Sequence, residues 1–224
     1  MKQANFTEIF TSIQGEGLLV GIPQVFVRFS KCNLKCKFCD TNFKTNFSLS
    51  SDQLVNLLKQ YNFKWLSLTG GEPLLYADFL NQCLPSLKKY FKIYLETNGT
   101  LPKELCKIIK WVDFISMDFK ISSATGLKDF TKEHYDFLQI SKTKKCLVKA
   151  IITSSTTKKD IENCVNVIEK INPKIPLILQ PVSLGKKIKK TPDLKKLLSF
   201  YLIANKVLKE VRIIPQVHLL MKWK

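Results

Sequence analysis

The sequence predicts an α/β fold, a partial (open) TIM-like barrel of about six parallel strands, in a single domain that spans residues 1–224. Two observations predict it. Apolar, β-rich runs alternate with stretches of helical periodicity, which is typical of a parallel sheet with right-handed crossovers. The 224 residues suffice for one domain, but the core strands are too few to close an eight-stranded barrel.

Seven runs are expected to be strands and five intervening stretches are expected to be helices. The strand candidates are residues 25–30, 65–69, 92–96, 114–119, 147–153, 176–180 and 211–214. The helix candidates are residues 52–61, 77–90, 102–110, 158–171 and 193–209. In the first helix, apolar residues recur at helical spacing from Leu54 onwards, with Ser51 or Asp52 as the N-cap. Pro102 suits the first turn of the third helix.

The chain is strongly basic, with a net charge of +18 from 36 Lys plus Arg against 18 Asp plus Glu. Such an excess attracts anions and nucleic acid. The lysines are spread along the chain, however, and the one dense run, residues 185–190, lacks interleaved aromatic residues. We therefore expect a lysine-rich surface with a charged loop tip, and no direct binding of nucleic acid.

The sequence has no run of roughly 18 apolar residues, the length needed to cross a membrane. Its first ten residues lack the apolar core and cleavage site of a signal peptide. We therefore expect a cytoplasmic protein that does not bind membranes.

Three of the seven cysteines, Cys32, Cys36 and Cys39, lie in one short run with the spacing C-x3-C-x2-C. This set can hold three irons of a four-iron cubane, which normally takes four thiolates, and it leaves one iron open. A zinc site would need a fourth Cys or His, but His134 and His218 lie far from the run, and His134 is expected in a loop without assigned chemistry. A thioredoxin-like pair does not explain the third cysteine.

Polar and glycine-rich motifs follow several of the predicted strands. The run Gly70-Gly-Glu-Pro follows the strand at 65–69, and Thr97-Asn-Gly follows the strand at 92–96. Lys120 and Gln180 end two later strands. Because chemistry collects at the carboxyl ends of parallel strands, we expect these motifs to face a common mouth.

The cysteine run, with Phe38 directly before Cys39, resembles the signature of the radical S-adenosylmethionine (SAM) superfamily, C-x3-C-x-aromatic-C. The resemblance implies a 4Fe–4S cluster on the three cysteines, which generate the radical. The methionyl amine and carboxylate of SAM chelate its open iron, and one electron releases a 5′-deoxyadenosyl radical. The Gly-Gly-Glu-Pro run resembles the superfamily's second motif, in which glycines let backbone approach the ligand and Glu72 adds charge or holds the turn.

Over essentially the whole chain, the sequence resembles the family of the 7-carboxy-7-deazaguanine synthases. Four features carry this resemblance: the run Phe-Thr-Ser-Ile-Gln-Gly-Glu-Gly at residues 10–17 ahead of the first strand, Arg28 within that strand, Cys-Asp-Thr at 39–41, and Pro-Gln-Val-His at 215–218. The resemblance implies a carbon–nitrogen lyase that converts 6-carboxy-5,6,7,8-tetrahydropterin to 7-carboxy-7-deazaguanine with loss of ammonia, on the route to the tRNA base queuosine. It also implies Mg²⁺, a homodimer, and a flavodoxin or ferredoxin as electron donor.

The resemblance also assigns roles to individual residues. Gln14 and Glu16 suit the amide edge of a pterin, Arg28 suits the substrate carboxylate unless it pairs with Glu8 or Glu16, and Thr41 is implied as a magnesium ligand through its hydroxyl. The expected substrate contacts are Ile13, Gln14, Gly15, Glu16, Arg28, Thr97, Gln216 and His218. The expected SAM contacts are Phe38, Cys39, Asp40, Gly70, Gly71, Glu72, Gly99, Asp118, Lys120 and Gln180.

Asp118 departs from the family pattern, because many relatives carry Ser-Pro-Lys where this chain has Asp118-Phe-Lys120. Asp118 can bind the ribose hydroxyls of SAM or only pair with Lys120. Two other functions remain open at this point. An enzyme that places a glycyl radical on a partner protein would share the cysteine motif. An iron–sulfur or zinc protein that binds RNA would need a fourth metal ligand and an RNA motif, and the sequence offers neither.

Overall fold

The computed structural model describes residues 3–39, 41, 43–185 and 187–221. Within them the chain forms one nine-stranded sheet with the order β3-β1-β2-β4-β5-β6-β7-β8-β9. From β2 to β9 every neighbouring pair is parallel, whereas β1 pairs antiparallel with both β2 and β3. The predicted open α/β sheet of parallel strands is confirmed, with seven parallel strands rather than about six, and the antiparallel pairing of β1 was not predicted.

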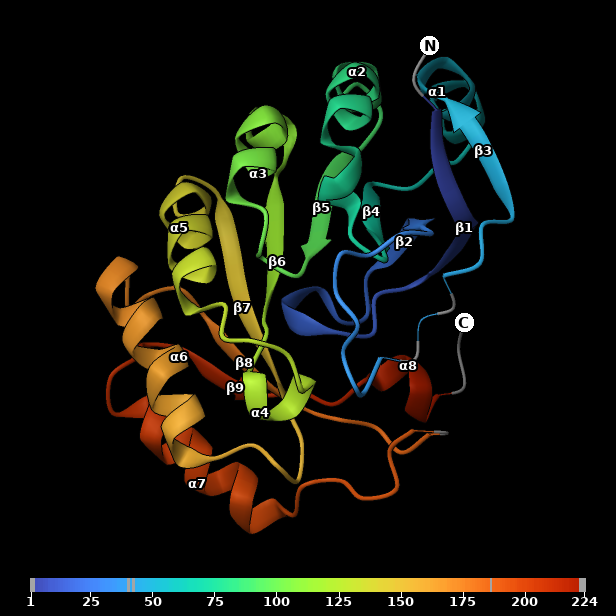
Figure 1. Cartoon of the computed structure of the whole chain (residues 1–224). Coiled ribbons are helices and arrows are strands. Elements are labelled where there is room, and N and C mark those ends of the chain that lie inside the picture. Colours follow the sequence, from blue (N-terminus) through green and yellow to red (C-terminus); the bar gives the residue numbers. More distant parts are fainter. Residues whose placement is uncertain (1–2, 40, 42, 186, 222–224) are drawn as a thin grey trace.

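Helices cover one face of the sheet in a curved outer layer that runs from α1 to α7 (Figure 1). The strands are β1 (Gln3–Ile13), β2 (Pro23–Phe29), β3 (Phe47–Ser50), β4 (Trp65–Gly70), β5 (Lys92–Thr97), β6 (Phe114–Phe119), β7 (Lys145–Ile152), β8 (Leu177–Pro181) and β9 (Val211–Ile213). The helices are α1 (Ser51–Leu58), α2 (Ala77–Leu87), α3 (Pro102–Ile108), α4 (Ser122–Thr125), α5 (Thr131–Ser141), α6 (Lys158–Ile171), α7 (Leu194–Asn205) and α8 (Val217–Leu220). Short 3₁₀ turns are η1 (Gly17–Leu19), η2 (Pro73–Tyr76) and η3 (Ile109–Trp111).

Several elements were absent from the sequence prediction, among them β1, β3 and α5. The run at 10–17 was placed ahead of the first strand, but its first four residues belong to β1, which pairs with β2 in a register that sets Glu8 opposite Arg28. β3 is a short edge strand on β1. The expectation that His134 lies in a loop was wrong, because it lies in α5 and is buried. α5 has no side-chain N-cap hydrogen bond, so the usual start signal is missing.

The helix starts follow local hydrogen bonding. α1 is capped by Ser50, one residue before the predicted caps, in a capping box in which the Ser50 hydroxyl accepts from Gln53 N and Gln53 Oε1 accepts from Ser50 N. Thr157 and Asp160 form the same box at α6. Pro102 opens α3 as predicted.

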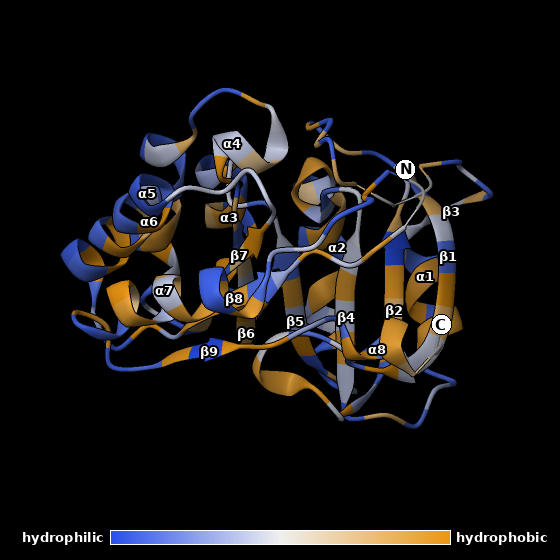
Figure 2. Ribbon diagram, turned by 90° about the horizontal axis from the view of Figure 1, so that it is seen from below, coloured by the Kyte–Doolittle hydropathy of each residue, from blue (hydrophilic) through white to orange (hydrophobic). Residues whose placement is uncertain are grey.

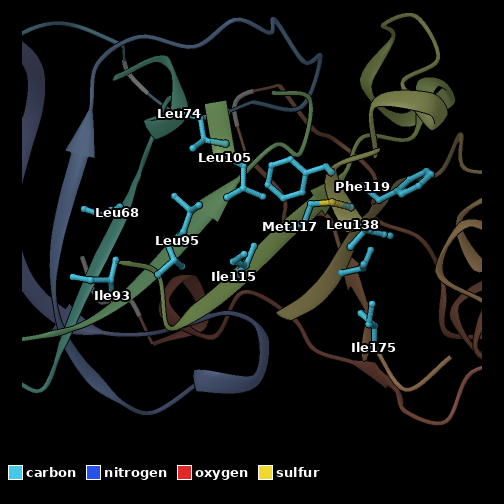
Figure 3. Packing of buried hydrophobic residues seen from close by; sticks show 14 of the residues in the cluster. Leu68, Leu74, Ile93, Leu95, Leu105, Ile115, Met117, Phe119, Leu138 and Ile175 are labelled. Atoms are coloured by element: carbon cyan, nitrogen blue, oxygen red, sulfur yellow. The ribbon is translucent and has the colours of Figure 1, made fainter. Parts of the chain in front are cut away.

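The core lies between the sheet and the helical layer. Leu68, Leu95 and Met117 on β4, β5 and β6 are fully buried, as are Leu105 and Leu138 on the helices that cover them (Figure 3). The hydropathy colouring separates apolar strands and inner helix faces from polar outer turns, most clearly on α5 and α6 (Figure 2). Parallel strands buried on both faces read as apolar runs, which is why they could be predicted. Among the described residues, no helix combines the length and the apolar character needed to cross a membrane.

Candidate active site

A cavity of about 600 Å³ opens at the carboxyl ends of the parallel strands, where the cysteine loop, the β1–β2 turn and α8 meet. Most of the predicted site residues line it, namely Ile13, Gln14, Gly15, Glu16, Arg28, Cys32, Cys36, Phe38, Cys39, Thr41, Gly70, Gly71, Thr97, Asp118, Lys120, Gln180, Gln216 and His218. Glu72 and Gly99 do not line the cavity. Asp40 falls outside the residues that the structure describes.

The three predicted cluster ligands, Cys32, Cys36 and Cys39, are free, partly exposed thiols on one loop. The Cys32 sulfur lies 3.4 Å from Leu34 N and 3.9 Å from Asn98 Nδ2, two donors that favour a thiolate. Burial raises the pKa of the Cys32 and Cys36 thiols, a shift that a bound cation opposes. Three thiols open to one cavity fit a cluster with one open iron. Among the described residues, no three metal-ligating side chains are already close enough to hold a metal ion, so the three thiols would have to move together to bind the cluster.

Gly71 is required by the chain's own backbone. Its N–H donates to Phe29 O at 2.8 Å, and the next N–H, of Glu72, donates to Lys31 O at 2.7 Å. A Cβ at Gly71 would overlap the carbonyl group of Lys31 and would lie 3.0 Å from Cys32 N. From the sequence, this glycine was expected to let the backbone approach the ligand. The structure adds that it lets the loop after β4 lie against the start of the cysteine loop.

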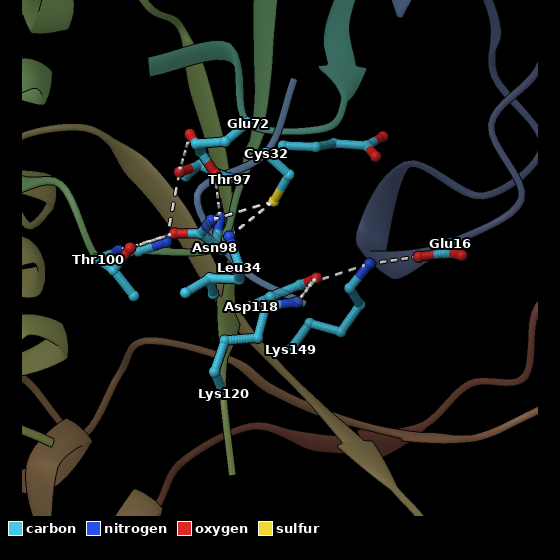
Figure 4. A network of polar contacts seen from close by, with 12 residues as sticks. Glu16, Cys32, Leu34, Glu72, Thr97, Asn98, Thr100, Asp118, Lys120 and Lys149 are labelled. Atoms are coloured by element: carbon cyan, nitrogen blue, oxygen red, sulfur yellow. Dashed lines mark hydrogen bonds and ion pairs between the residues drawn. The ribbon is translucent and has the colours of Figure 1, made fainter. Parts of the chain in front are cut away.

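The sequence left two roles open for Glu72, and the structure shows that its side chain holds the turn. Its carboxylate accepts from Leu74 N at 3.0 Å, from Thr97 Oγ1 at 2.8 Å and from Asn98 N at 2.8 Å. The side chain is fully buried, and this burial raises the pKa of Glu72 to about 7. Glu72 therefore ties the loop after β4 to the end of β5 (Figure 4).

His134 joins the ends of β5 and β6 from beneath the cavity. Its Nε2 lies 3.2 Å from Asn98 O and 3.3 Å from Lys120 N, and its ring centroid lies 4.4 Å from that of Phe119. The side chain is fully buried, and desolvation lowers the pKa of His134 to about 4. The imidazole is therefore neutral at physiological pH and supports two strand ends that line the cavity.

This buried histidine predicts a loss of stability in acid. Its pKa falls from 6.5 to about 4 on folding, so below pH 6.5 only the unfolded chain takes up the proton. His134 should cost about 2 kcal/mol of the free energy of unfolding between pH 7 and pH 5. Urea unfolding at pH 7 and pH 5 measures the change. The free energy of unfolding should drop by about 2 kcal/mol more in the wild type than in His134→Asn.

His218→Asn is the matched control, because His218 is the other histidine and is only partly buried. The raised pKa of Glu72 lowers stability as the pH rises toward 7. Glu72 is present in the wild type and in His134→Asn, so its effect cancels when these two proteins are compared. Equal drops in the wild type and in His134→Asn would contradict the assignment.

Gln14 is held rigidly at the other end of the cavity. Its Nε2 donates to Glu96 Oε1 at 2.7 Å, and its Oε1 accepts from Glu16 N at 3.0 Å. Glu96 also accepts from Thr69 Oγ1 at 2.9 Å, and burial raises its pKa. The amide is thus fixed against the wall, with one N–H left to donate.

Arg28 forms the ion pair with Glu8 that the sequence left open as one of its two roles. Its Nε lies 3.0 Å from Glu8 Oε1, across the β1–β2 pair, and its guanidinium lies 5.4 Å from the centre of the Phe10 ring. It also lines the cavity. A guanidinium has five N–H donors, so pairing with Glu8 leaves others for an anionic ligand.

A chain of alternating charges crosses the cavity from Glu16 to Lys120 (Figure 4). Lys149, which the sequence analysis missed, contacts Glu16 Oε2 and lies 3.1 Å from Asp118 Oδ1. Asp118 Oδ2 in turn lies 2.9 Å from Lys120 Nζ, the pairing considered from the sequence. Burial pushes the pKa values of Glu16 and Asp118 up, but the lysines outweigh it and hold both below their usual values. The signal for Lys149 was a single charge within the predicted apolar strand at 147–153.

Two C-terminal segments border the mouth. Val217 N donates to Gly15 O at 3.0 Å, and a Cβ on Gly15 would overlap the His218 side chain. Gln216 Nε2 donates to Glu16 Oε1 at 2.8 Å. The lysine run at 185–190 was expected to be a charged loop tip, but Lys187 lines the cavity and donates to Cys39 O at 2.7 Å.

Known proteins match both the sequence and the fold. A profile of the radical SAM superfamily matches residues 26–170. The 7-carboxy-7-deazaguanine synthase of Geobacter sulfurreducens is 38% identical over 96% of each chain. The synthase of Archaeoglobus fulgidus is 32% identical and covers 96% of this chain and 97% of its own length. The crystal structure of QueE from Escherichia coli, 20% identical, supports the fold with a TM-score of 0.65 over 96% of this chain and 95% of that one. The chain belongs to the radical SAM superfamily and, within it, to the family of the 7-carboxy-7-deazaguanine synthases.

Proposed function

We propose that this protein converts 6-carboxy-5,6,7,8-tetrahydropterin to 7-carboxy-7-deazaguanine with loss of ammonia, in the biosynthesis of queuosine and other 7-deazapurines. One observation carries the proposal. The fixed donors and acceptors of the β1–β2 turn, Gln14 and Glu16, line the same cavity as the three cysteines. A pterin held against this turn would be within the cavity in which the radical is generated.

The turn and the C-terminal segment suit the pterin. Glu16 is held as a carboxylate by Lys149 and Gln216, so it can accept from the amino and ring N–H groups of the pterin. Gln14 has one free N–H for the pterin carbonyl. Arg28 can bind the substrate carboxylate in bidentate fashion. Ile13, Gly15, Thr97 and His218 complete this part of the wall.

The opposite wall suits the cofactors. Cys32, Cys36 and Cys39 would hold the 4Fe–4S cluster that membership of the superfamily implies. With SAM and one electron, the cluster would supply the chemistry that removes a hydrogen atom from C6 of the pterin. We assign the SAM contacts to lining residues of this wall: Phe38, Gly70, Gly71, Asp118, Lys120 and Gln180. Glu72 acts from behind the wall by binding the end of β5, and Gly99 lets the chain after β5 pack closely against Met117 and His134.

Thr41 is the proposed magnesium ligand. It lines the cavity beside Cys39, and a hydroxyl is a hard oxygen ligand that suits Mg²⁺ together with a substrate carboxylate and waters. Thr41→Ala should raise the magnesium concentration needed for half-maximal activity by about tenfold, the loss expected from about 1.4 kcal/mol of binding energy. Cluster content and SAM binding should not change.

The measurement is a magnesium titration of product formation, with Thr45→Ala as the matched control. Thr45 bonds Ser30 at 2.8 Å and does not line the cavity. An unchanged titration in Thr41→Ala would show that Thr41 is not a magnesium ligand.

The decisive experiment is anaerobic incubation of reconstituted protein with SAM, reductant, Mg²⁺ and 6-carboxytetrahydropterin. Mass spectrometry should detect 7-carboxy-7-deazaguanine. A fully loaded protein that forms none, but cleaves SAM with a protein substrate, would instead be an enzyme that places a glycyl radical on a partner protein. We further propose that the cytoplasmic protein is a homodimer that receives its electron from a flavodoxin or ferredoxin.

A further inference from the structure

We propose that Lys149 is a positioning residue that sets the pterin end of the cavity in register with the SAM end, by fixing the Glu16 and Asp118 carboxylates on one ammonium group. The inference rests on the function proposed above, since it takes Glu16 as a pterin contact and Asp118 as a SAM contact.

The sheet itself places Lys149 between these two groups. Lys149 and Asp118 are directly opposite each other in the parallel pair β6–β7, and the Lys149 Nζ to Asp118 Oδ1 distance is 3.1 Å. Glu16 comes from the β1–β2 turn, far away in sequence, and its Oε2 contacts the same ammonium group. One lysine on a rigid strand therefore joins a turn to a strand end.

The contact orients both carboxylates. Glu16 has one oxygen bound by Lys149 and the other by Gln216, at 2.8 Å. Asp118 has one oxygen on Lys149 and the other on Lys120, at 2.9 Å. Both oxygens of each carboxylate are bound, and all of these residues line the cavity. A carboxylate has about four lone-pair sites, so each can still accept from a ligand. The ligands would thus meet acceptors whose positions are already fixed.

Burial makes the lysine necessary. Lys149 is 5% exposed, and Glu96 adds a third carboxylate nearby, which helps to raise the pKa of Lys149 well above its ordinary value. Without the ammonium group, Asp118 would keep Lys120, but the buried Glu16 would lose its cationic partner and would be repelled by Asp118 and Glu96. Glu16 would then turn away from its present position or take up a proton, and either change removes an acceptor for the pterin.

Lys149→Met tests the inference, because methionine keeps most of the side-chain volume and removes the charge. Lys145→Met is the matched control, on the same strand but at an exposed position away from the cavity. With the pterin varied at saturating SAM, Lys149→Met should raise KM for the pterin at least tenfold. It should also form several molecules of 5′-deoxyadenosine for each deazaguanine, because the radical meets a misplaced substrate. Lys145→Met should match the wild type.

A double-mutant cycle with Glu16→Gln separates positioning from a structural role. If Lys149 acts through Glu16, Lys149→Met should change KM less than twofold in the Glu16→Gln background. Lys149→Arg, which keeps the charge, should have a KM for the pterin between those of the wild type and Lys149→Met. If Lys149→Met does not fold with a full cluster, Lys149→Gln carries the same expectations.

The outcomes are distinct. A wild type that forms no deazaguanine overturns the proposed function. If the wild type is active but Lys149→Met, or Lys149→Gln in its place, has an unchanged KM for the pterin and an unchanged product ratio, this inference alone is overturned. Additive effects in the cycle, or lower kcat with unchanged KM, also overturn it, since they would assign Lys149 a structural role only.

Discussion

Cys36→Ala is expected to abolish both the visible absorbance of the cluster and the formation of deazaguanine. All three thiols of the loop are needed. A four-iron cluster normally takes four thiolates, and this loop offers three, so Cys36→Ala would leave a second iron without a protein ligand. Absorbance and iron content after anaerobic reconstitution measure the cluster. Turnover should fall below detection, since no radical forms without it.

Cys106→Ala is the matched control, because Cys106 is a free and exposed thiol on α3, away from the cavity. It should reconstitute and turn over like the wild type. Normal anaerobic turnover by Cys36→Ala would remove the cysteine loop from the chemistry and, with it, the proposed reaction.

Much of this site could be predicted because its signals are local. The spacing of Cys32, Cys36 and Cys39 is visible within eight residues, and all three line the cavity as expected. The strands from β4 to β8 are apolar runs that a parallel sheet buries on both faces, so the motifs after them had to share one edge. Thr97 reached the cavity for this reason, because it ends the parallel strand β5.

The buried polar partners could not be predicted, because long-range pairing creates them. Lys149 gives the same sequence signal as Arg28, a single charge within a predicted apolar strand, but its role depends on a turn 133 residues away in the chain. His134 was missed because its helix lacks a side-chain cap and because its partners, Asn98 O and Lys120 N, are backbone groups with no sequence signature.

The Gly70-Gly-Glu-Pro motif also makes contacts within the protein that the sequence does not reveal. The sequence shows that Gly70, Gly71 and Glu72 follow a strand, and this suggests contact with a ligand. The structure adds contacts to the protein's own backbone, since Glu72 binds the end of β5 and Gly71 lies against the start of the cysteine loop. These contacts give the motif a second physical role, which is to support the loop that carries the cluster.

Gly71→Ala should therefore damage the cluster site. The new Cβ would overlap the Lys31 carbonyl group and crowd Cys32 N, so the two loops must separate. Overpacking of this kind typically costs about 1–3 kcal/mol of the free energy of unfolding. Displacement of Cys32 should also leave the reconstituted protein with less than about half of its iron and at least about tenfold lower turnover, a loss of about 1.4 kcal/mol in transition-state stabilisation. Urea unfolding, iron analysis and product formation measure these effects.

Gly185→Ala is the control, because a Cβ there meets nothing within 4 Å and the backbone is not left-handed. Its stability and iron content should equal those of the wild type. Gly70→Ala should be worse than Gly71→Ala, because its φ of +104° adds backbone strain to an overlap with Phe29. If Gly71→Ala kept full iron and stability, the loop after β4 would not support the cysteine loop, and the glycine would be needed only by the ligand.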